Sequence, residues 1–158
     1  MSPTPGDAYS VAVVTVEAAE FADMRRGLAP AFRATLADSE SSIKDAVEDA
    51  ALQALLLDLD SIGETTADGI EVLQEIRAIR DDIVIVAMTK SRERNLPLHA
   101  SQAGADEFVL SPVNYEELQG VLVRAVEKRA HELEGRRVVQ QAESRSAFRS
   151  LIGASAAM

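Results

Sequence analysis

The chain has 158 residues, of which 47% are apolar and 4% aromatic, which suits one domain with an aliphatic core and excludes a disordered tail. It has no cysteine, so disulfides, thiolate metal sites and a cysteine nucleophile are excluded. The net charge is −10, with +3 on residues 124–158 and −13 on residues 1–123. An acidic body repels the phosphates of nucleic acid, so we expect the chain not to bind nucleic acid directly.

The chain begins with a polar lead-in over residues 1–8. Met1 to Asp7 has neither a basic start nor an apolar core, so it does not have the pattern of a signal peptide. The longest apolar runs, such as Ala51 to Leu57, are too short to span a bilayer. We therefore expect a cytoplasmic chain with no membrane partner.

Apolar runs and helical patterns alternate along the rest of the chain. Strands are predicted at residues 9–16, 54–59, 83–88 and 107–110, with a weaker one at 33–37. Helices are predicted at 18–28, at 43–50 behind a cap at Ser41 or Ser42, at 70–79, at 96–103 before Gly104, and from about Asn114 onward. Five strands alternating with five helices predict an α/β fold with a doubly wound parallel sheet.

In such a sheet the functional crevice lies outside the carboxyl ends of the strands. The candidate residues are therefore those that end or follow the strands: Thr15, Val16, Glu17, Asp58, Thr89, Lys90 and Ser111. Asp60 and Glu64 are further carboxylates near Asp58 that could bind a cation in a different way, but acidic residues are common in loops, and we interpret them as ordinary loop acids.

Several motifs in order resemble the receiver domains of bacterial two-component response regulators. They are LLLDLD around Asp58, DGIEVLQEIR from Asp68, IVAMTK around Thr89, and AGADEFVLSP up to Pro112. The resemblance covers roughly residues 8–130, and it implies a receiver-like domain over residues 9–130. The implied fold is flavodoxin-like, with strand order 2-1-3-4-5 and here an extended C-terminal helix.

The resemblance also implies roles for individual residues. Asp58 matches the phosphoacceptor aspartate at the end of the third strand. Thr89 matches the switch hydroxyl that contacts the phosphoryl group, and Phe108 matches the rotating aromatic switch residue. Pro112 matches the proline that follows the family's conserved lysine.

The pocket departs from the family's pattern at the positions that assist phosphorylation. Thr15 and Val16 stand where the family carries an acidic pair for Mg²⁺, and Glu17 comes one step late. Ser111 replaces the lysine, and the loop after Asp58 is longer than usual. Phosphoryl transfer depends on neutralising charge with a metal and a cation. We therefore expect a degenerate, pseudo-receiver pocket with no Mg²⁺ cofactor, no metal ligands and no catalytic residue.

The tail carries a second resemblance. The segment SAFRSLIGASAAM, from Ser146 to Met158, resembles the start of the AAA+ ATPase domain in sigma-54-dependent transcription activators. This implies that residues 131–158 are a linker helix and the start of a truncated AAA+ domain. Sparse apolar residues along the helix from Asn114 to about Glu143 predict a homodimer through that helix.

Three functional hypotheses remain at this point. The first is a non-enzymatic degenerate receiver that regulates an attached sigma-54 activator through dimerisation or protein contacts. The second is a working receiver that a histidine kinase phosphorylates on Asp58. The third is a ligand-binding module of the same fold, which a glycine-rich phosphate loop would favour, but none follows any strand.

Overall fold

The computed structural model describes the backbone of residues 8–156 and the side chains of residues 8–135. Five parallel strands form one sheet in the order β2-β1-β3-β4-β5, which confirms the predicted flavodoxin-like topology. The strands are β1 (Tyr9–Val14), β2 (Phe32–Ala37), β3 (Ala54–Asp58), β4 (Val84–Thr89) and β5 (Glu107–Leu110).

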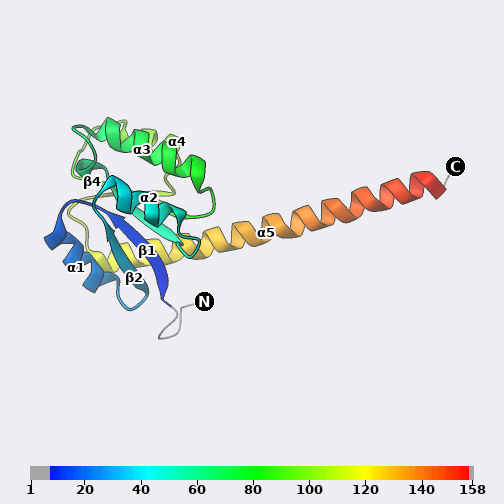
Figure 1. The fold of residues 1–158 in the computed structure, drawn as a ribbon, viewed down its shortest axis with the longest axis horizontal. Coiled ribbons are helices and arrows are strands. Elements are labelled where there is room, and N and C mark those ends of the chain that lie inside the picture. The colour runs from blue at the N-terminus through cyan, green and yellow to red at the C-terminus, as the bar shows by residue number, and fades with distance from the viewer. Residues whose placement is uncertain (1–7, 157–158) are drawn as a thin grey trace.

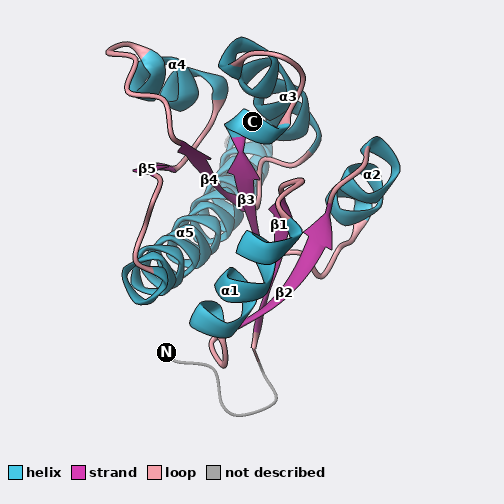
Figure 2. Cartoon of the chain, turned by 90° about the vertical axis from the view of Figure 1, so that its left-hand side faces the viewer, coloured by secondary structure: helices cyan, strands magenta, loops and turns pink. Residues whose placement is uncertain are grey.

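Helices cover both faces of this sheet (Figure 1, Figure 2). They are α1 (Ala18–Leu28), α2 (Glu40–Glu48), the short 3₁₀ helix η1 (Leu59–Ser61), α3 (Thr66–Ile79), α4 (Leu96–Ala103) and α5 (Tyr115–Ala156). Helices α1 and α5 pack on one face, and α2, α3 and α4 pack on the other.

Each face of the sheet forms its own hydrophobic core with the helices that cover it. These two cores explain why the central strands have almost no polar residues. Along β3, Leu55 and Leu57 face the α2–α3–α4 side, whereas Ala54 and Leu56 face the α1–α5 side. All four are fully buried. A strand buried on both faces must be apolar at every position, so its pattern does not alternate.

Several element boundaries differ from the sequence prediction. Strand β1 ends at Val14, so Thr15 and Val16 lie in the loop that follows it. The cap of α2 is Ser39, not Ser41 or Ser42, because the Ser39 hydroxyl accepts a hydrogen bond from the backbone N–H of Ser42 at 3.1 Å.

Helix α3 begins at Thr66, four residues earlier than predicted. The Asp68 carboxylate accepts hydrogen bonds from the backbone N–H groups of Glu64 and Thr65 at 2.8 and 3.1 Å. These bonds lower the pKa of Asp68 and satisfy backbone donors at the helix start, so the first turn forms ahead of Ile70, where the apolar pattern begins.

Helix α5 has 42 residues and runs well beyond the body of the domain (Figure 1). Its first turns bury Leu118, Leu122 and Val126 against the sheet. The helix was expected to reach about Glu143, but the backbone stays helical to Ala156. The side chains that carry the AAA+ resemblance lie outside the described residues, as does most of the lead-in over residues 1–8. Within the described part of the chain, no helix is both long and apolar enough to cross a membrane.

Candidate functional site

Asp58 ends β3 and lies in the crevice at the carboxyl edge of the sheet, where it is 6% exposed. One carboxylate oxygen, Oδ2, accepts hydrogen bonds from the Ser61 hydroxyl at 2.7 Å and from the Thr15 hydroxyl at 3.0 Å. The other, Oδ1, accepts from the backbone N–H of Asp60 at 3.1 Å. Neutral hydroxyl and amide donors therefore surround the carboxylate.

Thr15 and Ser61 also join the loop after β1 to η1. The Thr15 hydroxyl oxygen accepts from the backbone N–H of Glu17 at 3.1 Å. The Ser61 hydroxyl oxygen accepts from the backbone N–H of Val16 at 3.2 Å. The Val16 side chain itself is 60% exposed. Of the predicted pocket residues after β1, only Thr15 contacts Asp58 with its side chain.

Thr89 ends β4 and is fully buried, and its side chain contacts a carboxylate that sequence reasoning dismissed. The Thr89 hydroxyl donates to Oδ1 of Asp60 at 2.6 Å. The backbone N–H of Lys90 donates to Oδ2 of the same side chain at 2.7 Å. Asp60 thus links η1 to the start of the loop between β4 and α4.

The last predicted residues come from the edge of the sheet. Ser111 is 7% exposed, and its backbone N–H donates to the carbonyl of Thr89 at 2.8 Å. Phe108 pairs in register with Ala87 and packs against the core on the α2–α3–α4 side. The structure therefore places Ser111 beside Thr89 in the crevice and Phe108 in the adjoining core.

Most of this chain matches one known protein family. The family model described as the response regulator receiver domain matches residues 12–123. The chain belongs to this family. No curated protein matches the sequence.

Solved receiver-like structures share the fold at low sequence identity. A CheY-like response regulator receiver domain from Methanospirillum hungatei is 17% identical, with 79% of this chain covering 98% of it at a TM-score of 0.70. NtrX from Brucella abortus, solved in complex with ADP, is 22% identical at a TM-score of 0.72. That match covers 83% of this chain but only 29% of NtrX, so this receiver domain spans less than a third of that protein. The adenylate cyclase from Rhodopirellula baltica is 15% identical, with 84% of this chain covering 98% of it at a TM-score of 0.73.

The receiver fold is regulatory rather than catalytic, and the crevice of this receiver domain is strongly acidic. Burial raises the pKa of Glu20, in the first turn of α1, and the nearby Asp58 carboxylate raises it further. Glu17 and Asp60 act in the same direction, whereas the Lys90 ammonium lowers the pKa. Within the described residues, however, no three His, Cys, Asp or Glu side chains are grouped so that they could hold a metal ion.

Sequence reasoning missed the pocket contacts of Glu20, Asp60 and Ser61, although it named Asp60 as a loop acid near Asp58. Glu20 was detectable in principle, because it lies in the first turn of a helix that follows a strand leading into the crevice. Asp60 and Ser61 were not, because their positions depend on the turn that η1 makes after Asp58.

Proposed function

We propose that the chain is a regulatory receiver domain that works through protein contacts and dimerisation, and that does not use Asp58 as a metal-assisted phosphoacceptor. The observation that carries this proposal is the surroundings of Asp58, whose carboxylate is held by two hydroxyls and a backbone N–H. These donors give both carboxylate oxygens hydrogen-bond partners without a cation.

The residues at the usual metal position do not fit Mg²⁺. Mg²⁺ requires oxygen ligands in octahedral geometry, and its protein sites rely on carboxylates. Thr15 offers a hydroxyl that is already bonded to Asp58, and the exposed Val16 side chain offers no ligand atom. Ser111 brings no positive charge to offset a phosphoryl group. We therefore assign no metal cofactor to this pocket.

Asp60 supports the same interpretation. In a receiver that uses phosphate, the hydroxyl at the position of Thr89 would bind the phosphoryl group. Here the Thr89 hydroxyl and the Lys90 amide are engaged by the Asp60 carboxylate. The donors that would sense phosphate are therefore occupied by a side chain of the protein, and Phe108 acts as a packing residue.

In this proposal the receiver domain is cytoplasmic and is not an enzyme, and its effector is an attached AAA+ domain of a sigma-54-dependent activator. The tail segment from Ser146 to Met158 supports it, as does the similarity to NtrX, whose solved structure contains ADP. Helix α5 would join the two domains and provide the homodimer contact, because it extends far beyond the core that its first turns cover.

Phosphorylation of Asp58 by a histidine kinase is the second candidate, and one observation favours it. Asp58, Glu17 and Asp60 all lie close enough to Glu20 for their charges to act on its carboxyl group. A rearrangement of these side chains would bring more than one carboxylate to a cation beside Asp58.

Acetyl phosphate with Mg²⁺, followed by intact mass measurement, separates the two candidates. The phosphoryl group would pass to a carboxylate oxygen of Asp58 while acetate leaves. We expect no adduct on the native chain. A variant with Thr15→Asp, Val16→Asp and Ser111→Lys restores the family's assisting groups and is the positive control. An adduct on the native chain that disappears in Asp58→Asn would overturn the proposal.

A functional assay in the full-length activator addresses the same question. We expect Asp58→Asn to leave transcriptional output nearly unchanged, and Leu133→Glu in α5 to alter it strongly. Loss of output in a normally folded Asp58→Asn variant would restore the phosphorylated alternative.

A further inference from the structure

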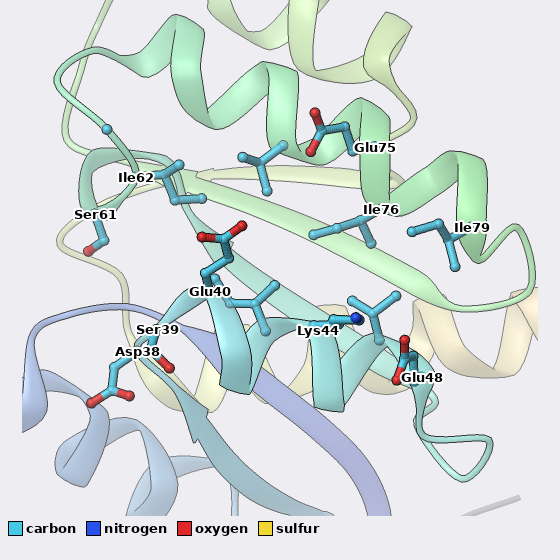
Figure 3. Close-up of a pocket in the computed structure, with 14 residues that line it drawn as sticks. Asp38, Ser39, Glu40, Lys44, Glu48, Ser61, Ile62, Glu75, Ile76 and Ile79 are labelled. Carbon is cyan, nitrogen blue, oxygen red and sulfur yellow. The ribbon is translucent and has the colours of Figure 1, made fainter.

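A groove lies between α2 and α3, on the outside of the sheet (Figure 3). It has a volume of about 560 Å³. Its floor is formed by branched aliphatic side chains from α2, α3 and the loop after η1: Ile43, Val47, Ile62, Val72, Ile76 and Ile79. Ile79, at one end, is 66% exposed.

Acidic side chains surround this apolar floor. Glu40 and Glu48 come from α2, Glu75 comes from α3, and Asp38 precedes α2. Lys44 is the one basic residue among the lining side chains. Figure 3 shows the carboxylates of Glu40, Glu48 and Glu75 along the edges of the groove.

The groove is connected to Asp58 through one residue. Ser61 lines the groove and donates its hydroxyl to Oδ2 of Asp58 at 2.7 Å. The adjoining Gly63 has a φ of +60°, and a Cβ there would collide with the Asp68 side chain. The turn from Ser61 to Gly63 therefore requires glycine, and it carries the groove residue that bonds to Asp58.

We propose that the α2–α3 groove is a docking site for a cationic amphipathic helix of a partner protein, and that Ser61 transmits its binding to Asp58. This inference rests on the proposed function, because a receiver that does not use phosphate needs another ligand with different affinity for its two states. The proposal places the binding of this second ligand on the α2–α3 face.

The shape and charge of the groove indicate this occupant. A helix of nine residues such as α2 is about 13 Å long, so the groove alongside it accepts roughly two turns of a helix. Amphipathic helices bind such grooves through apolar side chains at i, i+3, i+4 and i+7. Four carboxylates against one lysine favour a helix with Lys or Arg beside its apolar stripe.

The test uses the full 158-residue chain, ¹⁵N-labelled, with two synthetic helical peptides that share one leucine stripe. One peptide carries Lys and Arg beside the stripe, and the other carries Glu at the same positions. We expect the cationic peptide alone to shift the amide signals of residues 38–48, 61–63 and 72–79. We also expect it to shift the amide signal of Thr15, because Ser61 lies between the groove and Thr15.

Charge-reversal variants localise the binding. Glu48→Lys with Glu75→Lys should weaken binding of the cationic peptide at least about tenfold, which corresponds to about 1.4 kcal/mol. Glu71→Lys is the control, because Glu71 is on the same helix as Glu75 but does not line the groove, and we expect less than about a twofold change because solvent screens its charge from a peptide bound there. Ser61→Ala should retain the peptide but abolish its effect on Thr15.

Several results would overturn the proposal. They are failure of both peptides to bind, equal binding of the anionic peptide, shifts confined to the α4–β5–α5 surface, and self-association of the chain through the groove. None of them depends on phosphorylation, so a phosphate adduct on Asp58 would refute the proposed function while leaving the groove to be judged by this titration.

Discussion

The two ends of the sheet hold their polar side chains in different ways. At the carboxyl end, the acceptors are the Asp58 and Asp60 carboxylates, and their donors are hydroxyls and backbone N–H groups. At the opposite end, two arginines, Arg77 and Arg80, donate to backbone carbonyls and to carboxylates. The first arrangement concentrates negative charge, and the second neutralises it.

The arginines act as structural ties. Arg77 donates to the carbonyls of Gly104 and Ile83 at 2.9 and 2.8 Å and pairs with Asp106 at 2.7 Å. Arg80 donates to the carbonyls of Val47, Asp49 and Leu52 at 2.8 to 3.1 Å. Because these bonds join α2, α3 and the loops before β4 and β5, they hold the scaffold on which the crevice is built.

The comparison separates stability from function. A paired arginine that satisfies carbonyls lowers the free energy of the folded state. A crowded set of carboxylates raises the free energy of the folded state, and proteins retain such repulsion where a functional site requires it. We therefore expect substitutions at the arginine end to cost stability, and substitutions at the carboxylate end to cost little or to stabilise.

The largest expected effect follows from Arg80→Ala. It removes the hydrogen bonds that Arg80 donates to three carbonyls and to Asp82, and we expect a loss of about 3 kcal/mol in the free energy of unfolding, measured with urea. Asp60→Ala at the other end is the comparison variant and should cost less than half as much. Equal losses would show that the two ends do not differ as we describe.

Gly104→Ala should have an intermediate effect. Gly104 has a φ of +115°, and a Cβ there would lie 2.6 Å from Cγ of Arg77. We expect a loss of about 1–3 kcal/mol in thermal or urea unfolding, because a strained backbone adds to displacement of the arginine. Gly120→Ala is the control, because the nearest atom to its Cβ is 3.5 Å away, and it should stabilise α5 by about 0.5–1 kcal/mol. Unchanged stability of Gly104→Ala would contradict the tight contact with Arg77.

The smallest effect concerns Glu20 and depends on pH. The pKa of Glu20 is raised in the folded state by burial and by Asp58, so its contribution to stability falls as pH rises from its ordinary pKa of about 4.3 through the folded value. Glu20→Gln should therefore stabilise the protein at pH 7 by about a few tenths of a kcal/mol. The gain should vanish below pH of about 4, where Glu20 is protonated in both states.

Melting temperatures measured across this pH range test the expectation. Glu71→Gln, at an exposed position of α3, is the control and should show no such pH dependence. Destabilisation by Glu20→Gln at pH 7 would contradict the expectation, because it would mean that a favourable contact of the Glu20 carboxylate outweighs the repulsion from its acidic neighbours.

The sequence was sufficient for the order of the elements but not for the contacts in the crevice. The buried run around Leu55 and the strand-end positions of Asp58 and Thr89 follow from apolar patterning, which depends only on neighbouring residues. The bond between Thr89 and Asp60 joins residues 29 apart in the chain. It depends on how η1 turns after β3, and a polar loop pattern does not specify that turn.

The length of α5 has a mechanical consequence. At 1.5 Å per residue its 42 residues extend about 63 Å, and about 40 Å of this lies beyond Ala130. The helix is therefore a lever whose fulcrum is the packing of Leu118 and Leu122 on the sheet. From Leu122 to Ala156 the arm is about 51 Å, so a tilt of about 10° at that fulcrum would move the far end by about 9 Å, which exceeds the 5.4 Å pitch of a helix. A small displacement near the crevice would thus be amplified to the scale of a whole helical turn at the far end of α5.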